Sequence, residues 1–468
     1  MRRVVMLVDN AVEGDSRVQK AARSAADAGW HVTLIGCAHV DAERRWRLGD
    51  AEVRVLPLAA ARATPPATAS AVLSSPRGGA SASGGGAGSR DGSGLRGVSG
   101  LRARLVARGG LPLHAARLAR RPVEHAEVRF WRARLRDGAW RRLEPGLWDY
   151  ERVAGPVVDD LRPDLIHAHD FRMLGVAARA VDRARARAAG RDVKLVWDAH
   201  EWLPGARPRR DNARWLPAHL GYVREYVGHA DAVVTVSDTL ADLLVRDHDL
   251  PERPTVILNA PIAATTETSA PDLRKRCGLP PDTPLLVYSG AMAVQRGVDT
   301  VVEALPLLPG VHLALVVADP AAAYVRQVVA RADRHGVGDR VHVLPYVPHR
   351  QLVAFLATAD IGLIPLHHWP NHEIALITKF FEYAHARLPI VVSDVRTMAE
   401  TVRATGQGEV FRARDAADLA RAVRAVLADP ARYRAAYEGE DSPLPGWTWE
   451  AQAERLDALY RRLLTPIR

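Results

Sequence analysis

The stretch ALITKFFEYAHARLPIVVSD, residues 375–394, joins a predicted helix at 376–387 directly to an apolar strand at 389–393. Lys379 and Glu382 are three positions apart, so they are neighbours on one face of this helix. A strand and helix joined so closely are typical of parallel α/β proteins. The stretch therefore predicts one α/β unit with a cation and a carboxylate at its mouth.

The same alternation runs along most of the chain. Valine, isoleucine and leucine form short continuous runs, as expected for parallel strands buried on both faces. Helical stretches separate the runs, which indicates right-handed strand–helix–strand crossovers. The predicted strands are 3–9, 31–36, 52–57, 164–168, 193–198, 231–236 and 255–258, then 284–289, 311–317, 340–345, 360–364, 389–393 and 408–411. The predicted helices are 17–28, 146–161, 238–247, 298–308, 321–335, 349–359, 376–387 and 415–428.

With 468 residues, the chain is too long for one compact core. The two series of strands predict two doubly wound Rossmann-like domains, 1–262 and 271–440, joined by a proline- and threonine-containing stretch. Cys37 and Cys277 have no ligand-like spacing, and the first residues read as a strand rather than a signal peptide. These features favour a cytoplasmic location for the protein.

One segment interrupts the alternation. Residues 60–100 consist largely of alanine, serine, proline and glycine, which predicts disorder. Residues 101–142 carry twelve arginines and three acids, and therefore most of the net charge of +10. Leucine and tryptophan are interleaved with the arginines, so this segment is either a solvated helical insertion or a basic amphipathic helix on an anionic membrane surface. Nucleic acid is not an expected partner, because no recognised binding module surrounds it.

In open parallel sheets, ligands lie beyond the carboxyl ends of the strands. The strand at 284–289 leads into Gly290, where a backbone without a side chain lets a ligand approach. Arg296 stands beside the start of the next helix, and helix starts attract anions. Thr378 and Lys379 open a second such helix. Two cationic helix starts in one half of the chain indicate a site for a nucleoside diphosphate, with Glu382 able to accept the ribose hydroxyls.

The first half of the chain places histidines and acids at strand ends. HAHD follows the strand at 164–168, and WDAHEW contains the end of the strand at 193–198. His167 and His169 could be a metal pair, which leaves a metal-dependent hydrolase as an alternative. The later strand ends supply one carboxylate and no histidine, so such a centre would be poorly supplied with ligands.

Several motifs together resemble the family 4-like retaining glycosyltransferases of the GT-B fold. They include PDLIHAHD, VWDAHEWLP, ADAVVTVSDTLADLL, VYSGAMAVQRGVDTVVEAL and TKFFEYAHARLPIVVSD, and the resemblance covers nearly all of the chain outside about 60–142. It implies two Rossmann-like domains that face each other across a cleft. It also implies that the second domain holds the nucleotide-sugar and that the helix at 446–464 crosses back to the first domain.

The resemblance also implies roles for individual residues. His169 would lie near the transferred sugar and, with Arg296 and Lys379 at the diphosphate, would form the catalytic set. The donor-binding residues would be Gly290, Tyr346, Val347, Thr378 and Glu382. The acceptor-side residues would be Asp15, Arg17, His200 and Glu201. The expected activity is hexosyl transfer with retention to a glycan, glycolipid or small molecule, without a metal or other cofactor.

Two positions depart from the family pattern. Ala291 stands where the family has a second cation, and Ile374 stands where it has the first glutamate of a paired motif, with Glu373 one residue away. A third interpretation, a non-catalytic nucleotide-sugar-binding protein of the same fold, therefore stays open. The acceptor is also open; a lipid-linked one is compatible with the basic segment and with a peripheral membrane location.

Overall fold

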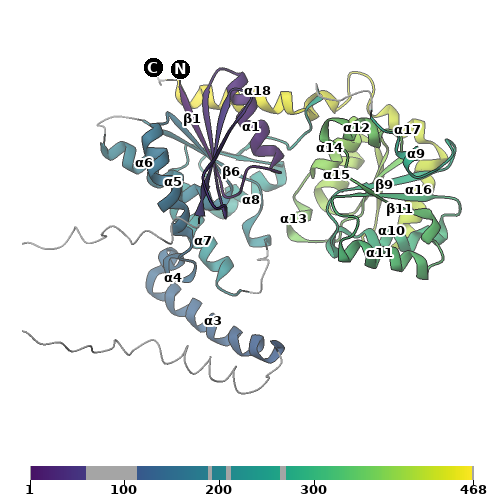
Figure 1. Cartoon of the computed structure of the whole chain (residues 1–468), viewed down its shortest axis with the longest axis horizontal. Helices are drawn as coiled ribbons and strands as arrows, with labels where there is room; N and C mark the ends of the chain where they lie inside the picture. The colour runs from purple at the N-terminus through teal and green to yellow at the C-terminus, as the bar shows by residue number, and fades with distance from the viewer. Residues whose placement is uncertain (1, 59–112, 188–191, 207–211, 264–269, 466–468) are drawn as a thin grey trace, which may run out of the picture.

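The computed structural model describes residues 2–58, 113–187, 192–206, 212–263 and 270–465. These residues form two lobes that lie side by side, each built on one sheet with helices packed against it (Figure 1). This arrangement is the predicted pair of Rossmann-like domains. The segment 60–100, which was expected to be disordered, lies outside the described residues, as do residues 101–112 of the basic segment.

The amino-terminal lobe contains an eight-stranded sheet with the order β3-β4-β2-β1-β5-β6-β7-β8. All neighbouring strands are parallel except β3 and β4, which pair antiparallel. The strands are β1 (Arg3–Val8), β2 (His31–Ala38), β3 (Arg44–Leu48), β4 (Ala51–Pro57), β5 (Leu165–His169), β6 (Lys194–Ala199), β7 (Ala232–Thr235) and β8 (Thr255–Val256).

The carboxy-terminal lobe contains a six-stranded sheet with the order β11-β10-β9-β12-β13-β14, in which every pair is parallel. The order reverses direction at β9, and ligands in such sheets lie outside the strand ends at this kind of point. The strands are β9 (Leu285–Ser289), β10 (His312–Val317), β11 (Val341–Pro345), β12 (Ile361–Ile364), β13 (Ile390–Ser393) and β14 (Gly408–Phe411).

Helices follow the strands in both lobes. Those of the first lobe are α1 (Ser16–Asp27), α3 (Leu113–Leu135), α4 (Trp140–Leu143), α5 (Leu147–Leu161), α6 (Asp170–Arg187), α7 (Trp215–Tyr226) and α8 (Asp238–His248). Those that follow are α9 (Leu273–Arg276), α10 (Val298–Ala304), α11 (Ala323–Arg334), α12 (His349–Leu356), α13 (Pro370–Glu373), α14 (Thr378–His385), α15 (Arg396–Thr405), α16 (Ala416–Ala428), α17 (Pro430–Ala435) and α18 (Trp449–Leu464).

Continuous apolar runs form the strands because both faces of each sheet are covered. In β1, Val5 and Leu7 belong to one buried cluster, whereas Val4, Met6 and Val8 belong to the cluster on the opposite face. Side chains that alternate between two buried faces are therefore mostly apolar on both of them. This explains why the strands were recognisable without an alternating polar pattern.

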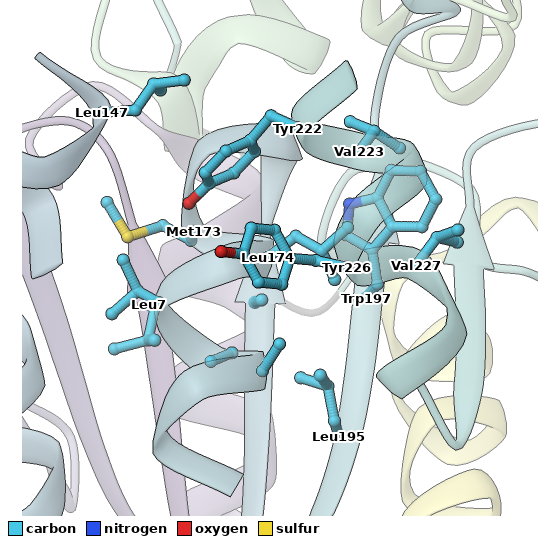
Figure 2. Close-up of a cluster of buried hydrophobic side chains, with 14 of the residues drawn as sticks. Leu7, Leu147, Met173, Leu174, Leu195, Trp197, Tyr222, Val223, Tyr226 and Val227 are labelled. Carbon is cyan, nitrogen blue, oxygen red and sulfur yellow. The ribbon is translucent and has the colours of Figure 1, made fainter. Parts of the chain in front are cut away.

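The cluster on the α5–α7 face of the first sheet contains several large aromatic side chains (Figure 2). Trp197 projects from β6 toward α7, where Tyr222 and Tyr226 pack ring against ring with centroids 5.0 Å apart. Helices α6 and α7 do not appear among the helices predicted from the sequence. Their buried faces complete this core.

Part of the basic segment belongs to the body of the protein, a placement that neither the solvated insertion nor the membrane helix predicted. Trp140 is fully buried, its ring lies 4.9 Å from that of Tyr222, and its Nε1 donates a hydrogen bond to Glu225. Leu143 is buried in the same cluster. The apolar residues after 135 therefore pack on α7, and only α3 extends outward at the edge of the lobe (Figure 1).

The structure confirms that the last helix returns to the first lobe. α18 runs back across the first lobe and ends near the amino terminus of the chain (Figure 1). Trp449, Leu456, Leu459 and Tyr460 are buried in the same cluster as β1 and α1. Among the described residues, no helix combines the length and the apolar character needed to cross a membrane.

Candidate active site

A cavity of about 700 Å³ lies between the two lobes, and residues of both lobes line it. It brings together all but one of the site residues predicted from the sequence. Those that line it are Asp15, Arg17, His200, Glu201, Gly290, Arg296, Tyr346, Val347, Thr378, Lys379 and Glu382. Arg296 and Lys379 therefore face one hollow.

Lys379 lies at the start of α14, whose preceding residue, Ile377, offers no side chain to cap the helix. The first backbone amides of such a helix lack intrahelical acceptors and attract anions. The Lys379 ammonium lies 5.0 Å from the centre of the Tyr288 ring. Burial, followed by the nearby charge of Arg296, lowers the pKa of Lys379 to about 8. A bound anion would restore the charge that burial disfavours.

Gly290 lines the cavity as predicted, and it has a second role that the sequence did not indicate. A Cβ at this position would lie 2.3 Å from Nζ of Lys379, and the backbone φ of 136° is disfavoured for residues with a side chain. The glycine therefore makes room for the lysine rather than simply for a ligand.

Arg296 ends a short 3₁₀ helix, η6 (Val294–Arg296), and is followed by Gly297. A Cβ on Gly297 would lie 1.8 Å from the carbonyl oxygen of Pro365, and φ is 70°. Only glycine allows this loop to pack against the end of β12. The packing places η6 at the rim of the cavity, so Arg296 and the start of α14 face the same space.

Glu382 lies one turn after Lys379 and is 8% exposed. Burial raises its pKa, although the charges of Lys379 and Lys20 act in the opposite direction. Tyr346 and Val347 follow β11 and line the same cavity. A carboxylate at the inner wall and an apolar flank at the mouth are suited to a ribose and a base, respectively.

The acceptor-side wall contains a buried network of charges around Asp198. Arg17 donates from two nitrogens to the two carboxylate oxygens, at 2.9 and 3.0 Å. His200 lies between Asp198 and Asp170, with nitrogen–oxygen distances of 3.1 and 3.3 Å. Burial disfavours the imidazolium, yet Asp170 and Asp198 outweigh it and raise the pKa of His200 to about 10. His200 is therefore a cation at neutral pH.

His169 is the one predicted site residue that the structure does not place on the cavity wall. Its side chain is fully buried; the ring stacks on His167 at 4.2 Å, and Nδ1 lies 3.2 Å from Asp198. It lies behind His200 because it is the last residue of β5, whereas His200 follows β6. Its proximity to the transferred sugar therefore stays a prediction.

His167, His169 and Asp198 lie close enough together to hold a metal ion. Both oxygens of Asp198, however, already accept hydrogen bonds from Arg17, and His167 Nδ1 lies 2.5 Å from the Tyr460 hydroxyl. Burial, followed by His169, lowers the pKa of His167 to about 3. A divalent cation would lie against the Arg17 guanidinium, so the arrangement is better explained as a structural network.

Sequence reasoning missed the residues that connect the lobes at the cavity. Lys20 donates to Asn259 and to the carbonyl oxygen of Ala260, and Asn259 donates to the Thr378 hydroxyl at 3.1 Å. Lys20 lies one turn after Arg17 on α1, a spacing that could have suggested a shared buried face. No local pattern connects either residue to α14.

A second set of contacts joins the lobes across the far side. Asn371 in α13 accepts a hydrogen bond from the Trp202 amide at 3.0 Å, and the Thr239 and Thr397 hydroxyls lie 3.0 Å apart. Ser237 donates to the carbonyl oxygen of Ile374. The Ile374 side chain is buried, and Glu373 contacts His368 and the Arg396 amide rather than the cavity. This segment therefore holds the lobes together.

Two family models match complementary parts of the chain. The model described as Glycosyltransferase Family 4 matches residues 96–260, and the model described as Glycosyl transferases group 1 matches residues 269–440. The first match begins before α3, so the family extends further into the basic segment than the sequence motifs indicated.

Curated relatives agree with these matches. A D-inositol 3-phosphate glycosyltransferase of Xylanimonas cellulosilytica is 30% identical over 313 residues, which cover 63% of this chain and 71% of the relative. A glycogen synthase of Mycobacterium tuberculosis is 32% identical over 288 residues, or 58% of this chain. The match spans only 61% of the length of that synthase.

Solved structures share the fold. The sucrose-phosphate synthase of Thermosynechococcus elongatus has a TM-score of 0.65 at 17% identity, with 99% of each chain covered. The Anabaena protein HepE in complex with UDP has a TM-score of 0.62 at 13% identity, covering 99% of this chain and all of that one. The fold and cleft define a GT-B α/β protein. The chain belongs to the family 4 glycosyltransferases.

Proposed function

We propose that this protein transfers a sugar from a nucleoside-diphosphate sugar to an acceptor in the cavity between its lobes. The observation that carries the proposal is the convergence of Arg296, Lys379 and the uncapped start of α14 on one cavity that also contains Glu382. Cations and free amides fit a diphosphate, and Glu382 fits the hydroxyls of a ribose. HepE, a relative in fold, has been solved with UDP and with UDP-glucose.

The chemistry of the transfer explains why these groups are needed. The bond between the anomeric carbon and the diphosphate oxygen breaks, and an acceptor oxygen forms a new bond to that carbon and loses its proton. Negative charge develops on the departing diphosphate. Fixed positive groups beside it stabilise the transition state more than the ground state, which is the usual source of the largest catalytic effect.

Replacing Lys379 tests the proposal. Lys379→Ala should lower the rate of nucleotide release from the preferred donor by roughly a hundredfold or more, because one fixed cation at the departing group is lost. A panel of nucleotide sugars identifies that donor first. Lys275→Ala, at an exposed lysine of α9 in the same lobe, is the matched control and should retain the wild-type rate. An unchanged rate in Lys379→Ala would exclude this site as the site of transfer.

The finer features of the reaction are part of the same proposal. Retention of anomeric configuration and a hexosyl donor are what the family resemblance implies, and proton NMR of the fresh product distinguishes retention from inversion.

The unpaired cysteines Cys37 and Cys277 support a reducing compartment such as the cytoplasm. The acceptor could be a glycan, a glycolipid or a small molecule, so a role in polysaccharide synthesis is one form of the proposal.

A metal-dependent hydrolase at His167, His169 and Asp198 is the less favoured candidate, because Arg17 already donates to both oxygens of Asp198. The two candidates differ in their response to chelation. We expect transfer to continue in EDTA, because Arg296, Lys379 and the helix start provide the positive charge. Loss of activity in EDTA with recovery on added zinc would favour the hydrolase. Binding of a donor without any transfer or hydrolysis would instead indicate the non-catalytic binding protein.

A further inference from the structure

Helix α3 presents an unpartnered surface that combines apolar and basic side chains. Six large apolar side chains are exposed among the described residues, and three of them belong to this helix: Val123 (62%), Phe130 (53%) and Leu135 (39%). Exposed apolar side chains that gather on one element of a folded protein mark an interaction site more often than scattered ones do. The exposed apolar side chains of α3 therefore indicate an interaction surface.

Four exposed apolar positions, among them Val123 and Phe130, lie along one stripe of the helix. Val123, Ala126, Phe130 and Ala133 are spaced by three, four and three residues, so they occupy one face, and all four are exposed. Val128 is buried and Trp131 is partly buried on the opposite side, where Arg142 lies over the Trp131 ring. The stripe therefore points away from the body of the protein.

The charges beside this stripe are positive and uncompensated. Arg129, Arg132 and Arg134 are exposed, and none has a carboxylate within 4.0 Å among the residues that the structure describes. Both acids of the described part of α3 turn toward the loop before α7. Glu127 pairs with Arg214, and Glu124 accepts a hydrogen bond from the Ala213 amide. The outward face thus carries arginines without acids.

We infer that α3 is a docking helix for an anionic lipid surface, lying flat with Val123 and Phe130 in the interface and the neighbouring arginines at the headgroups. A narrow apolar stripe flanked by arginines fits the boundary between headgroups and acyl chains, and negative lipids supply the missing counter-charge. Nucleic acid would also attract the arginines, but it would give no reason for an exposed aliphatic and aromatic stripe. No residue of the helix whose side chain the structure describes lines the cavity, so docking leaves the site open to its substrates.

Vesicle sedimentation of the full chain tests the inference. Wild-type protein should bind phosphatidylcholine vesicles that contain phosphatidylglycerol at least about tenfold more tightly than pure phosphatidylcholine vesicles, and added salt should weaken binding. Val123→Ser with Phe130→Ser, and separately Arg129→Glu with Arg134→Glu, should each reduce binding to the anionic vesicles by about tenfold or more. Nucleotide release with a soluble acceptor should be unchanged in both variants.

Matched substitutions on the other lobe are the controls. Leu307→Ser removes another exposed leucine, and Arg334→Glu with Arg403→Glu reverses two exposed arginines. Both control variants should bind the anionic vesicles like the wild type. Equal binding to neutral and anionic vesicles, or wild-type binding by both α3 variants, would overturn the inference. Binding of single-stranded RNA that depends on Arg129 and Arg134 but not on Phe130, without vesicle binding, would make α3 a nucleic-acid surface instead.

Discussion

At position 290, the absence of a side chain allows the Lys379 ammonium to occupy its place at the cavity. The Lys379 ammonium fills the space that a Cβ on Gly290 would take, so the loop after β9 and the start of α14 fit together only with glycine there. Glu382 lies one turn further along α14, but among the described residues no carboxylate oxygen lies within 4.0 Å of the Lys379 ammonium. The ammonium is thus available to an incoming diphosphate, because no ion pair has to be broken first.

Gly290→Ala should therefore weaken nucleotide binding as well as folding. The added methyl group displaces Lys379, and the backbone conformation alone costs about 1–2 kcal/mol. Calorimetry with the nucleotide and chemical denaturation measure the two effects. Gly310→Ala is the control, because Gly310 also has a positive φ, of 73°, but has nothing within 4 Å of the added Cβ. It should lose stability but keep wild-type affinity; equal affinities in the two variants would refute the steric role of Gly290.

His200 should make stability depend on pH. Asp170 and Asp198 raise its folded-state pKa to about 10, above the ordinary value of 6.5, against the effect of burial. Its contribution is therefore fully present below about pH 6.5 and is lost as the pH rises to 10. In His200→Gln, the fall in unfolding free energy between these pH values should be smaller than in the wild type by about 2–4 kcal/mol. If urea denaturation gives the same pH dependence of the unfolding free energy for His200→Gln and the wild type, His200 is not held as a cation.

Among the elements, α18 connects the two lobes: it follows the second lobe in the chain and packs against the first. Its start follows the carboxy-terminal lobe, whereas Leu456, Leu459 and Tyr460 are buried against the first sheet and α1. The Tyr460 hydroxyl also contacts His167, next to the charge network around Asp198. The helix therefore covers a face of the first domain that would otherwise expose apolar side chains to water.

Leu456→Ala should lower the free energy of unfolding of the first lobe by about 2–4 kcal/mol, because it leaves a cavity between α18 and the sheet. Urea denaturation followed by tryptophan fluorescence measures the loss. Arg455→Ala changes the exposed neighbouring residue of the same helix and should have little effect. If both variants are equally stable, α18 does not cover the core of that lobe in solution.

At the scale of the whole molecule, hydrogen bonds on two sides of the cavity set how the lobes meet. Asn259 reaches Thr378 beside the linker, whereas Asn371 and Thr239 reach across the opposite side. Each bond is worth only about 1 kcal/mol. Together they bias the molecule toward an arrangement in which both lobes line one cavity.

Removing the far-side contacts should loosen this arrangement. The double variant Thr239→Val and Asn371→Ala should have a larger radius of gyration than the wild type in small-angle scattering without ligand, because the lobes lose their contacts opposite the linker. Thr401→Val is the control, since the Thr401 hydroxyl bonds only within α15. Indistinguishable scattering from all three proteins would show that these contacts do not hold the lobes together.

The sequence by itself determined the parallel strands of the two sheets, because strands buried on both faces need continuous apolar runs that can be read locally. It also brought Arg296, Lys379 and Glu382 to one site, because parallel strands place their carboxyl ends at the same edge. Only the tertiary structure decided that His169 lies behind His200, that Trp140 belongs to the core, and that Asn259, held by Lys20, reaches the start of α14. These outcomes depend on contacts between residues distant along the chain, which no local pattern of residues records.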